Sequence, residues 1–388
     1  MLAILGRWPN MRGHGEGSIT HRKDGRWQCQ ISIKNDKGKT ERKTLYGKTK
    51  KEVQEKLRLA INEQKQGTLA TGPRQTLAVY LPYWLENICK PLVRKATHKQ
   101  YRSALNAHFL PALGQLTLQN LRPEHIQSLY ADMVEDGLAA STIGAIHAVL
   151  HKALEDAIKW NFVSRNVSSL VSLPRIERPE MHVLTPEQAH KLLETAKGSR
   201  IEVLLILAIT TGARRGEMLA LRWNDVDLEK GVMNICRTMS WVSGYGYVEN
   251  EPKTKAGRRR IMLTDAAIAA LKEHKVRQKE ARVIAGDEWK ERDIVFSNIY
   301  GSFLNPNAVL VWYHSLLEKA GLPDMRFHDL RHSAATILLV MGVHPKVVQE
   351  LLGHSTIAMT MDVYSHLLPS MHQDATDKMN TLFKKIEL

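Results

Sequence analysis

The sequence predicts a multidomain protein that is mainly α-helical and contains small β elements. Its 388 residues are too many for a single domain with one hydrophobic core, since a domain holds roughly 150 residues. Hydrophobic residues recur at helical spacing through most of the chain, whereas strand-like alternation is confined to residues 17–46 and 231–263. Two polar segments that contain proline, residues 68–73 and 171–179, have the composition of linkers. The expected order is a small β-sheet with a helix, a helical domain, and a mixed α+β domain.

The N-terminal segment predicts a three-stranded antiparallel sheet followed by one helix. Strand-like runs alternate with turn residues in the order 18–20, Asp24-Gly25, 27–34, 35–38 and 40–46. Val53, Leu57 and Ile61 then follow at helical spacing, and Gly67 is a typical C-terminal stop.

Positive charge is concentrated in this segment. The whole chain carries a formal charge of +15, and residues 1–70 hold 16 Lys and Arg against 7 Asp and Glu. So many cations on a small unit repel one another unless a polyanion neutralises them. The composition leaves both nucleic acid and anionic lipid open as partners. A DNA-gripping sheet whose cations meet phosphates is the functional interpretation, and a solvated charged mini-domain is the structural one.

Residues 77–166 predict a helical domain of four or five helices. Apolar residues recur at helical spacing throughout the segment, and they are interpreted as its core. Thr97, Pro123 and Ser141 mark expected helix starts. This part of the sequence indicates nothing about chemistry.

The third domain is predicted to be mixed α+β. It begins near Leu184, where Thr185 is a helix cap and Pro186 occupies the first helical position. Residues 201–211 have the pattern of a buried helix, residues 231–263 alternate and turn as strands do, and helical patterns return from Asp265.

The cysteines and the hydropathy pattern predict an intracellular, soluble protein. Cys29, Cys89 and Cys236 lie far apart without CxxC spacing, so neither a disulfide framework nor a zinc site is indicated. The apolar opening ends at Arg7, and no later run approaches the ~20 apolar residues of a membrane span. We expect a cytoplasmic protein with no membrane partner. Met11 competes with Met1 as the true start.

Two basic positions of the third domain are candidates for chemistry. Thr211-Gly212 interrupts an apolar helix so that Arg214 can project from the turn. Lys253 lies in a basic stretch between two strand-like runs, where a lysine on a hairpin tip can reach into a groove. Taken singly, each is more often an ordinary surface residue.

Three further positions follow towards the C-terminus. His328 and Arg331 are three residues apart in a helical pattern and therefore share a face. His354 ends the run Leu351-Leu-Gly-His, and Tyr364 follows it by ten residues. No cysteine accompanies these histidines, so no metal site is predicted.

The order of these motifs resembles the signature of the tyrosine recombinases, in the integrase branch of phages and integrative elements. The matching residues are Arg214, Lys253, His328, Arg331, His354 and Tyr364. The resemblance covers the whole chain. It implies an N-terminal arm-type DNA-binding domain (11–67), a helical core-binding domain of the SAM-like type (76–170) and a catalytic domain (184–388).

The resemblance also implies a role for each residue. Two arginines, Arg214 and Arg331, would clamp the phosphate through bidentate hydrogen bonds. His354 would donate a further hydrogen bond to it, and His328 would bind phosphate or assist proton transfer from the tyrosine. Tyr364 would attack as the nucleophile, and Lys253 would protonate the departing 5′ oxygen.

The implied reaction needs neither ATP nor metal, because a 3′-phosphotyrosyl intermediate conserves the bond energy. No cofactor is therefore expected. The expected partners are double-stranded attachment-site DNA, further copies of the chain in a DNA-bound homotetramer, and a directionality factor. The expected function is integration and excision of a phage or other mobile element.

Some alternatives stay open at this point. Lys255 competes with Lys253 as the general acid, and Arg215 competes less strongly with Arg214. Glu217 is expected to orient the active-site His or Arg groups rather than to react. The competing functions are an Xer-type dimer-resolving recombinase, a type IB topoisomerase-like enzyme, and a DNA-binding protein without catalysis.

Overall fold

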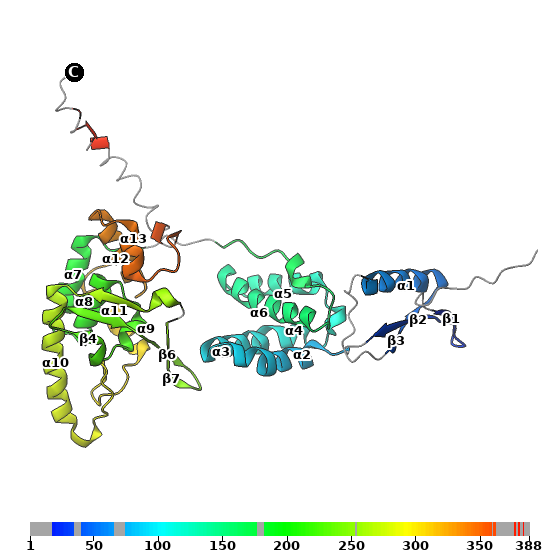
Figure 1. Ribbon diagram of the computed structural model, residues 1–388, viewed down its shortest axis with the longest axis horizontal. Helices are drawn as coiled ribbons and strands as arrows, with labels where there is room; N and C mark the ends of the chain where they lie inside the picture. The colour runs from blue at the N-terminus through cyan, green and yellow to red at the C-terminus, as the bar shows by residue number, and fades with distance from the viewer. Residues whose placement is uncertain are drawn as a thin grey trace, which may run out of the picture. The chain divides into compact units, whose positions relative to one another are not determined.

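The computed structural model describes residues 18–34, 40–65, 74–176, 182–252, 254–358, 360–361, 376–377, 379–380 and 383. The chain divides into two compact units, Met1–Arg178 and Pro179–Leu388. Figure 1 shows helices as the main element of the chain, with small antiparallel sheets near the N-terminus and within the second unit. In the part of the chain that is described, no helix is long and apolar enough to cross a membrane.

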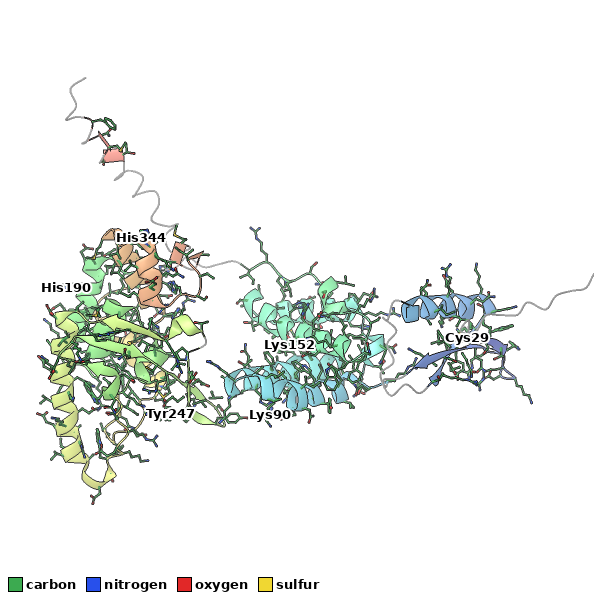
Figure 2. All side chains as sticks on the ribbon, in the orientation of Figure 1. Cys29, Lys90, Lys152, His190, Tyr247 and His344 are labelled. Carbon is green, nitrogen blue, oxygen red and sulfur yellow. The ribbon has the colours of Figure 1, made fainter. Side chains whose placement is uncertain are left out.

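The N-terminal sheet and its helix are confirmed. The elements are β1 (Ser18–His21), β2 (Trp27–Lys34), β3 (Thr40–Gly47) and α1 (Lys50–Lys65). The strands pair antiparallel in the order β1-β2-β3, and α1 packs on one face of the sheet (Figure 1). Cys29 and Ile31 of β2 are buried together with Val53 and Leu57 of α1, and Figure 2 labels Cys29 between sheet and helix. The alternate residues of β2 are left for the opposite face.

The predicted helical domain is also confirmed. Its elements are α2 (Leu77–Tyr83), η1 (Trp84–Cys89), η2 (Lys90–Leu92), α3 (Lys95–Ala104), η3 (Leu105–Phe109), α4 (Leu110–Leu113), η4 (Leu118–Asn120), α5 (Pro123–Glu135), α6 (Ala140–Lys159) and η5 (Val167–Leu170). The expected start at Pro123 is right. Those at Thr97 and Ser141 are wrong, because α3 and α6 begin at Lys95 and Ala140 behind residues that provide no side-chain cap.

The second unit is mixed α+β, as predicted. Its helices are α7 (Pro186–Ala196), α8 (Glu202–Thr211), α9 (Arg215–Leu219), η6 (Trp223–Asp225), η7 (Lys255–Gly257), α10 (Asp265–Ala285), η8 (Gly286–Glu288), α11 (Pro306–Lys319), α12 (Asp329–Val340) and α13 (Pro345–Leu352). Its strands are β4 (Val226–Asp227), β5 (Val232–Ile235), β6 (Thr238–Val242), β7 (Gly246–Asn250) and β8 (Arg259–Met262). Thr185 caps α7 by accepting a hydrogen bond from the Gln188 backbone N–H, as its sequence position predicts.

The strand pairing corrects one expectation. The basic stretch around Lys253 was expected at a hairpin tip, which requires its two flanking strands to pair with each other. Instead, β7 pairs with β6, while β8 pairs with β5 in a second sheet, β4-β5-β8. The segment from β7 to β8 is therefore a connection between two sheets.

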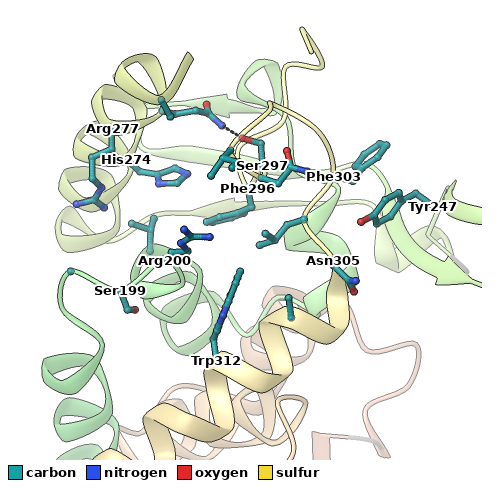
Figure 3. A pocket seen from close by; sticks show the side chains of 18 residues that line it. Ser199, Arg200, Tyr247, His274, Arg277, Phe296, Ser297, Phe303, Asn305 and Trp312 are labelled. Atoms are coloured by element: carbon teal, nitrogen blue, oxygen red, sulfur yellow. Dashed lines mark hydrogen bonds between the residues drawn. The ribbon is translucent and has the colours of Figure 1, made fainter. Parts of the chain in front are cut away.

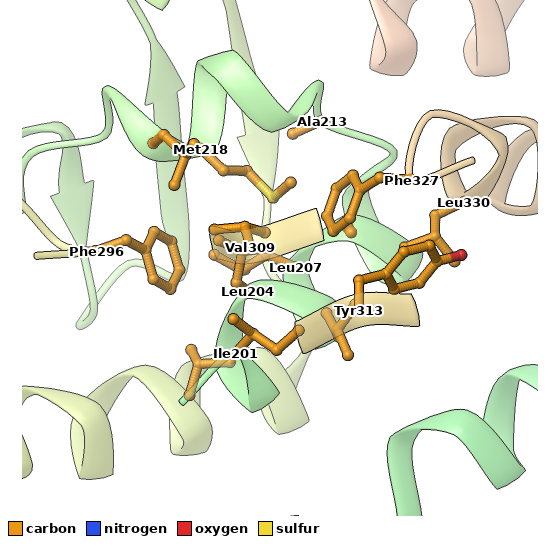
Figure 4. Close-up of a cluster of buried hydrophobic side chains, with 14 of the residues drawn as sticks. Ile201, Leu204, Leu207, Ala213, Met218, Phe296, Val309, Tyr313, Phe327 and Leu330 are labelled. Atoms are coloured by element: carbon orange, nitrogen blue, oxygen red, sulfur yellow. The ribbon is translucent and has the colours of Figure 1, made fainter. Parts of the chain in front are cut away.

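The core of this unit is built around α8, whose side chains are buried or half-buried along the whole helix. Ile201, Leu204 and Leu207 contribute to one buried cluster with Val309 and Tyr313 from α11 (Figure 4). The turn at the C-terminal end of α8 therefore follows a helix that has no fully exposed side chain.

Gly212 ends α8 in a left-handed backbone conformation, with φ of +61°. A Cβ atom at this position would lie 2.2 Å from Cδ2 of Leu352 and 3.5 Å from Cβ of Ala334. Glycine is required here both by the backbone and by the close approach of α12 and α13.

We expect Gly212→Ala to lower the free energy of unfolding by about 3 kcal/mol, because a positive-φ penalty adds to overpacking. Gly198→Ala is the matched control, since Gly198 has φ of +72° but nothing within 4 Å of its would-be Cβ. Urea unfolding of both variants tests this. Equal destabilisation of the two would show that the contact with Leu352 contributes nothing.

Candidate active site

Arg331 is the most buried cation of the predicted site. Only 3% of this residue is exposed. Its Nη1 donates to the Gly212 carbonyl at 2.8 Å and its Nη2 to the Leu352 carbonyl at 2.5 Å. Among the described residues no carboxylate lies within ion-pair distance of it. Burial, followed by repulsion from Arg214 and Arg259, lowers the pKa of Arg331 to about 9. An anion that entered the site would offset this unfavourable free energy of the buried positive charge.

Arg214 and Glu217 are fixed by the start of α9. Arg214 is the N-cap residue, and its backbone N–H donates to Glu217 Oε2 at 3.0 Å. Its Nη1 also donates to Oε1 of the same carboxylate at 2.8 Å, while part of the Arg214 side chain remains exposed. Burial alone would raise the pKa of Glu217, but hydrogen bonds and charge from Arg259 and Arg214 lower it. Glu217 therefore stays ionised and orients Arg214, which agrees with its expected role.

Two histidines complete the cluster. His354 is buried, and its Nδ1 lies 2.9 Å from Oγ1 of Thr360. Burial and the charges of Arg331 and Arg214 lower the pKa of His354 to about 3. The His328 side chain reaches the surface, yet desolvation, His332, Arg331 and Arg214 lower its pKa to about 4. Both imidazoles are thus neutral near pH 7.

The electrostatic balance of the cluster favours an anion. Three guanidinium groups, Arg214, Arg259 and Arg331, face one carboxylate, Glu217, so the fixed charge is +2. A phosphodiester carries one negative charge and gathers a second in a five-coordinate transition state. The cluster therefore complements a doubly charged anion better than a singly charged one.

Four of the six predicted residues come together in this cluster: Arg214, His328, Arg331 and His354. His328 is the N-cap residue of α12 rather than part of the helix itself. Lys253 and Tyr364 lie outside the described residues, as does the side chain of the competing Lys255. The guanidinium of Arg215 donates to the Pro306 carbonyl at 3.2 Å.

Arg259 and Thr360 were not predicted. Arg259 is the second of three consecutive arginines, and a run of equal charges gives no sign of which member is buried. Thr360 lies six residues after His354, where sequence spacing alone indicates no contact.

A cavity of about 430 Å³ lies elsewhere in this unit (Figure 3). Its lining includes Arg200 near the start of α8, His274 of α10 and Trp312 of α11, and the Arg200 guanidinium lies over the Trp312 ring. None of the clustered arginines and histidines lines it. In the described part of the chain no group of His, Cys, Asp or Glu is placed to hold a metal ion.

The low pKa of His354 makes a prediction for stability. As pH falls, the unfolded chain takes up a proton at its ordinary pKa of 6.5, before the folded state does near 3. The contribution of neutral His354 to the free energy of unfolding is therefore full above about pH 6.5 and is lost progressively as the pH falls towards 3. We expect its contribution at pH 5 to be ~2 kcal/mol smaller than at pH 7.

His354→Gln should remove this part of the pH dependence, which urea unfolding at pH 7 and pH 5 would measure. His190→Gln is the control, because His190 is exposed on α7, where Figure 2 labels it, and is not among the charges that act on the clustered residues. An unchanged slope in His354→Gln would mean that His354 is already protonated in the folded protein at pH 5.

Comparison with known proteins agrees with this geometry. Residues 182–371 match the model of the phage integrase family, and residues 76–134 match that of the phage integrase N-terminal SAM-like domain. A XerC-like tyrosine recombinase of Caldanaerobacter subterraneus is 30% identical over 93% of this chain and 98% of its own. An integrase of Saccharopolyspora erythraea is 28% identical over 95% and 97%.

Solved structures share the fold. The Tn1549 transposon integrase bound to transposon right end DNA aligns with a TM-score of 0.65 at 22% identity, over 75% of this chain and 95% of its own. A lambda integrase dimer bound to a core site aligns with a TM-score of 0.55 at 17% identity, over 91% and 96%. The fold and the relatives define the class, a site-specific recombinase of the tyrosine type. The chain belongs to the phage integrase family, in its integrase branch.

Proposed function

We propose that this protein integrates and excises a mobile element by cutting DNA through a covalent 3′-phosphotyrosyl bond to Tyr364. The buried, anion-seeking cluster around Arg331 and Arg214 carries the proposal, because it supplies a phosphate site on the domain that the family model matches. Relatives named as the ICEBs1 integrase of Bacillus subtilis and the transposase of Tn916 from Enterococcus faecalis support a mobile element as the substrate.

The proposed reaction is a transesterification in two steps. The Tyr364 oxygen attacks the phosphorus, the P–O bond to the tyrosine forms, and the P–O5′ bond breaks. The phenol proton passes to a base, for which neutral His328 is available, and Lys253 gives a proton to the 5′ oxygen. Arg214, Arg331 and His354 hold the non-bridging oxygens. A 5′-hydroxyl of the partner strand then attacks the phosphotyrosine and releases the enzyme, so that neither ATP nor metal is consumed.

The three parts of the chain then have separate tasks. Residues 11–67 would form an arm-type DNA-binding domain, 76–170 the core-binding domain and 184–388 the catalytic domain. The outer face of the N-terminal sheet supports the first task. Gln28 and Gln30 of β2 alternate with the helix-facing Cys29 and Ile31, and such amide side chains can read base edges in the major groove.

Double-stranded attachment-site DNA is the proposed partner, bound by a homotetramer of this chain in the cytoplasm, with a directionality factor setting the outcome. A lambda integrase tetramer bound to a Holliday junction has the same fold and supports this assembly.

The test is incubation of the protein with a labelled, nicked attachment-site duplex in EDTA, followed by denaturing electrophoresis. If the attachment site is not known, selection from a random DNA library supplies it. We expect a covalent protein–DNA adduct without metal. Binding without any adduct would favour a DNA-binding protein, and an adduct that requires divalent metal would favour a different nuclease chemistry.

A further inference from the structure

The side chain of Arg259 is buried although the residue belongs to a run of three arginines. Its side chain is 6% exposed, and it lies on β8, directly after the connection from β7. Each nitrogen of its guanidinium has a different acceptor. Nε donates to the Leu351 carbonyl at 2.7 Å, Nη1 to the Gly257 carbonyl at 3.3 Å, and Nη2 to Glu217 Oε2 at 2.9 Å.

These three acceptors belong to three different parts of the site. Leu351 lies near the C-terminal end of α13, shortly before His354. Gly257 belongs to the connection that carries the basic residues. Glu217 holds Arg214 at the start of α9. Arg259 thereby links the phosphate-binding groups to the β8 end of the β7–β8 connection.

A close backbone contact reinforces this junction. Gly353 follows α13 with φ of +67°, and a Cβ there would lie 2.7 Å from the Ala256 carbonyl and 3.0 Å from Cδ of Arg259. The connection and the end of α13 can approach this closely only because residue 353 has no side chain.

We propose that Arg259 is a positioning residue for protonation of the leaving group. It holds the β8 end of the β7–β8 connection against the end of α13. The general acid carried by this connection then keeps a constant position relative to the phosphate clamp. The inference rests on the proposed function. The planar fork of arginine is needed, because a lysine ammonium cannot direct donors to three acceptors spread around a plane.

The chemistry of the leaving group provides a direct test. Breaking the P–O5′ bond leaves an alkoxide that needs a proton, whereas a 5′-bridging sulfur leaves as a stable thiolate that needs none. Misplacing the general acid should therefore slow cleavage of ordinary DNA and spare cleavage of the phosphorothiolate. Misplacing the phosphate clamp should slow both.

The experiment compares Arg259→Gln with wild type on both substrates at saturating DNA. We expect cleavage of ordinary DNA to fall ~100-fold, as for a catalytic group displaced by about an ångström. Cleavage of the phosphorothiolate should fall much less, because that substrate is affected only by the loss of one positive charge from the cluster. Arg260→Gln is the matched control, because Arg260 is the next residue of β8 and is exposed. It should alter neither the rates nor their ratio.

Circular dichroism shows whether Arg259→Gln folds. If it does not, Arg259→Lys, which keeps the charge beside Glu217, tests whether the defect lies in protonation of the leaving group. It should show a smaller defect that is also rescued by sulfur. Equal slowing of both substrates, or no slowing of either, would overturn the proposal. A wild type that forms no adduct on either substrate would instead overturn the proposed function.

Discussion

Tyr364→Phe is expected to abolish the covalent protein–DNA adduct. The phenol oxygen is the only atom that the substitution removes, and without it no phosphotyrosyl bond can form. The adduct should fall by at least ~10⁴-fold, as for other enzymes that lose their nucleophile. DNA binding should persist, because the arginine and histidine side chains of the phosphate site are unchanged. Electrophoresis of the adduct and filter binding of the DNA measure the two quantities separately.

Tyr300→Phe is the control, since Tyr300 is an exposed tyrosine of the same unit, outside the cluster. It should form adduct at the wild-type rate. An adduct that survives in Tyr364→Phe would remove Tyr364 as the nucleophile, and peptide mapping of the surviving adduct would identify the residue that attacks.

Local sequence patterns predicted the helices and the small sheets well, because these elements depend on nearby residues. The Thr185-Pro186 start of α7 and the apolar α8 follow directly from capping and hydrophobicity. The pairing of β8 with β5 does not follow from local patterns, because β7 could form a hairpin with β6 before it or with β8 after it. Helix starts at Lys95 and Ala140 also escaped prediction, since the residues before them offer no capping side chain.

The grouping of four site residues was predictable from the order of the motifs and the family resemblance that this order carries. Arg214, Arg331 and His354 were expected to bind phosphate, and His328 to bind it or to assist proton transfer. The fold brings the four together from three separate stretches of sequence. What spacing could not show is how they are held. The carbonyls of Gly212 and Leu352 are backbone acceptors that no residue identity reveals. Arg259 is chemically identical to its neighbours and is distinguished only by burial.

Arg331→Gln is expected to cost activity but little stability. Removing one preorganised donor to the developing charge should slow cleavage by ~10³-fold. In the DNA-free protein, however, Arg331 is a buried cation without a described carboxylate partner, repelled by Arg214 and Arg259. The substitution relieves that repulsion, and the amide of glutamine can donate to one of the two carbonyls. We expect the free energy of unfolding to stay within ~1 kcal/mol of wild type.

Arg326→Gln should do the opposite, which makes it the matched control. Arg326 is exposed, but it donates through Nε and Nη2 to the buried carboxylate of Asp329, the first residue of α12, the helix that carries Arg331. Leaving that carboxylate without its cation should cost ~1–3 kcal/mol and leave cleavage near the wild-type rate. Single-turnover cleavage and urea unfolding of both variants separate the roles. Destabilisation of Arg331→Gln by more than Arg326→Gln would make Arg331 chiefly structural, because a residue whose main partner is a bound anion contributes little stability to the DNA-free protein.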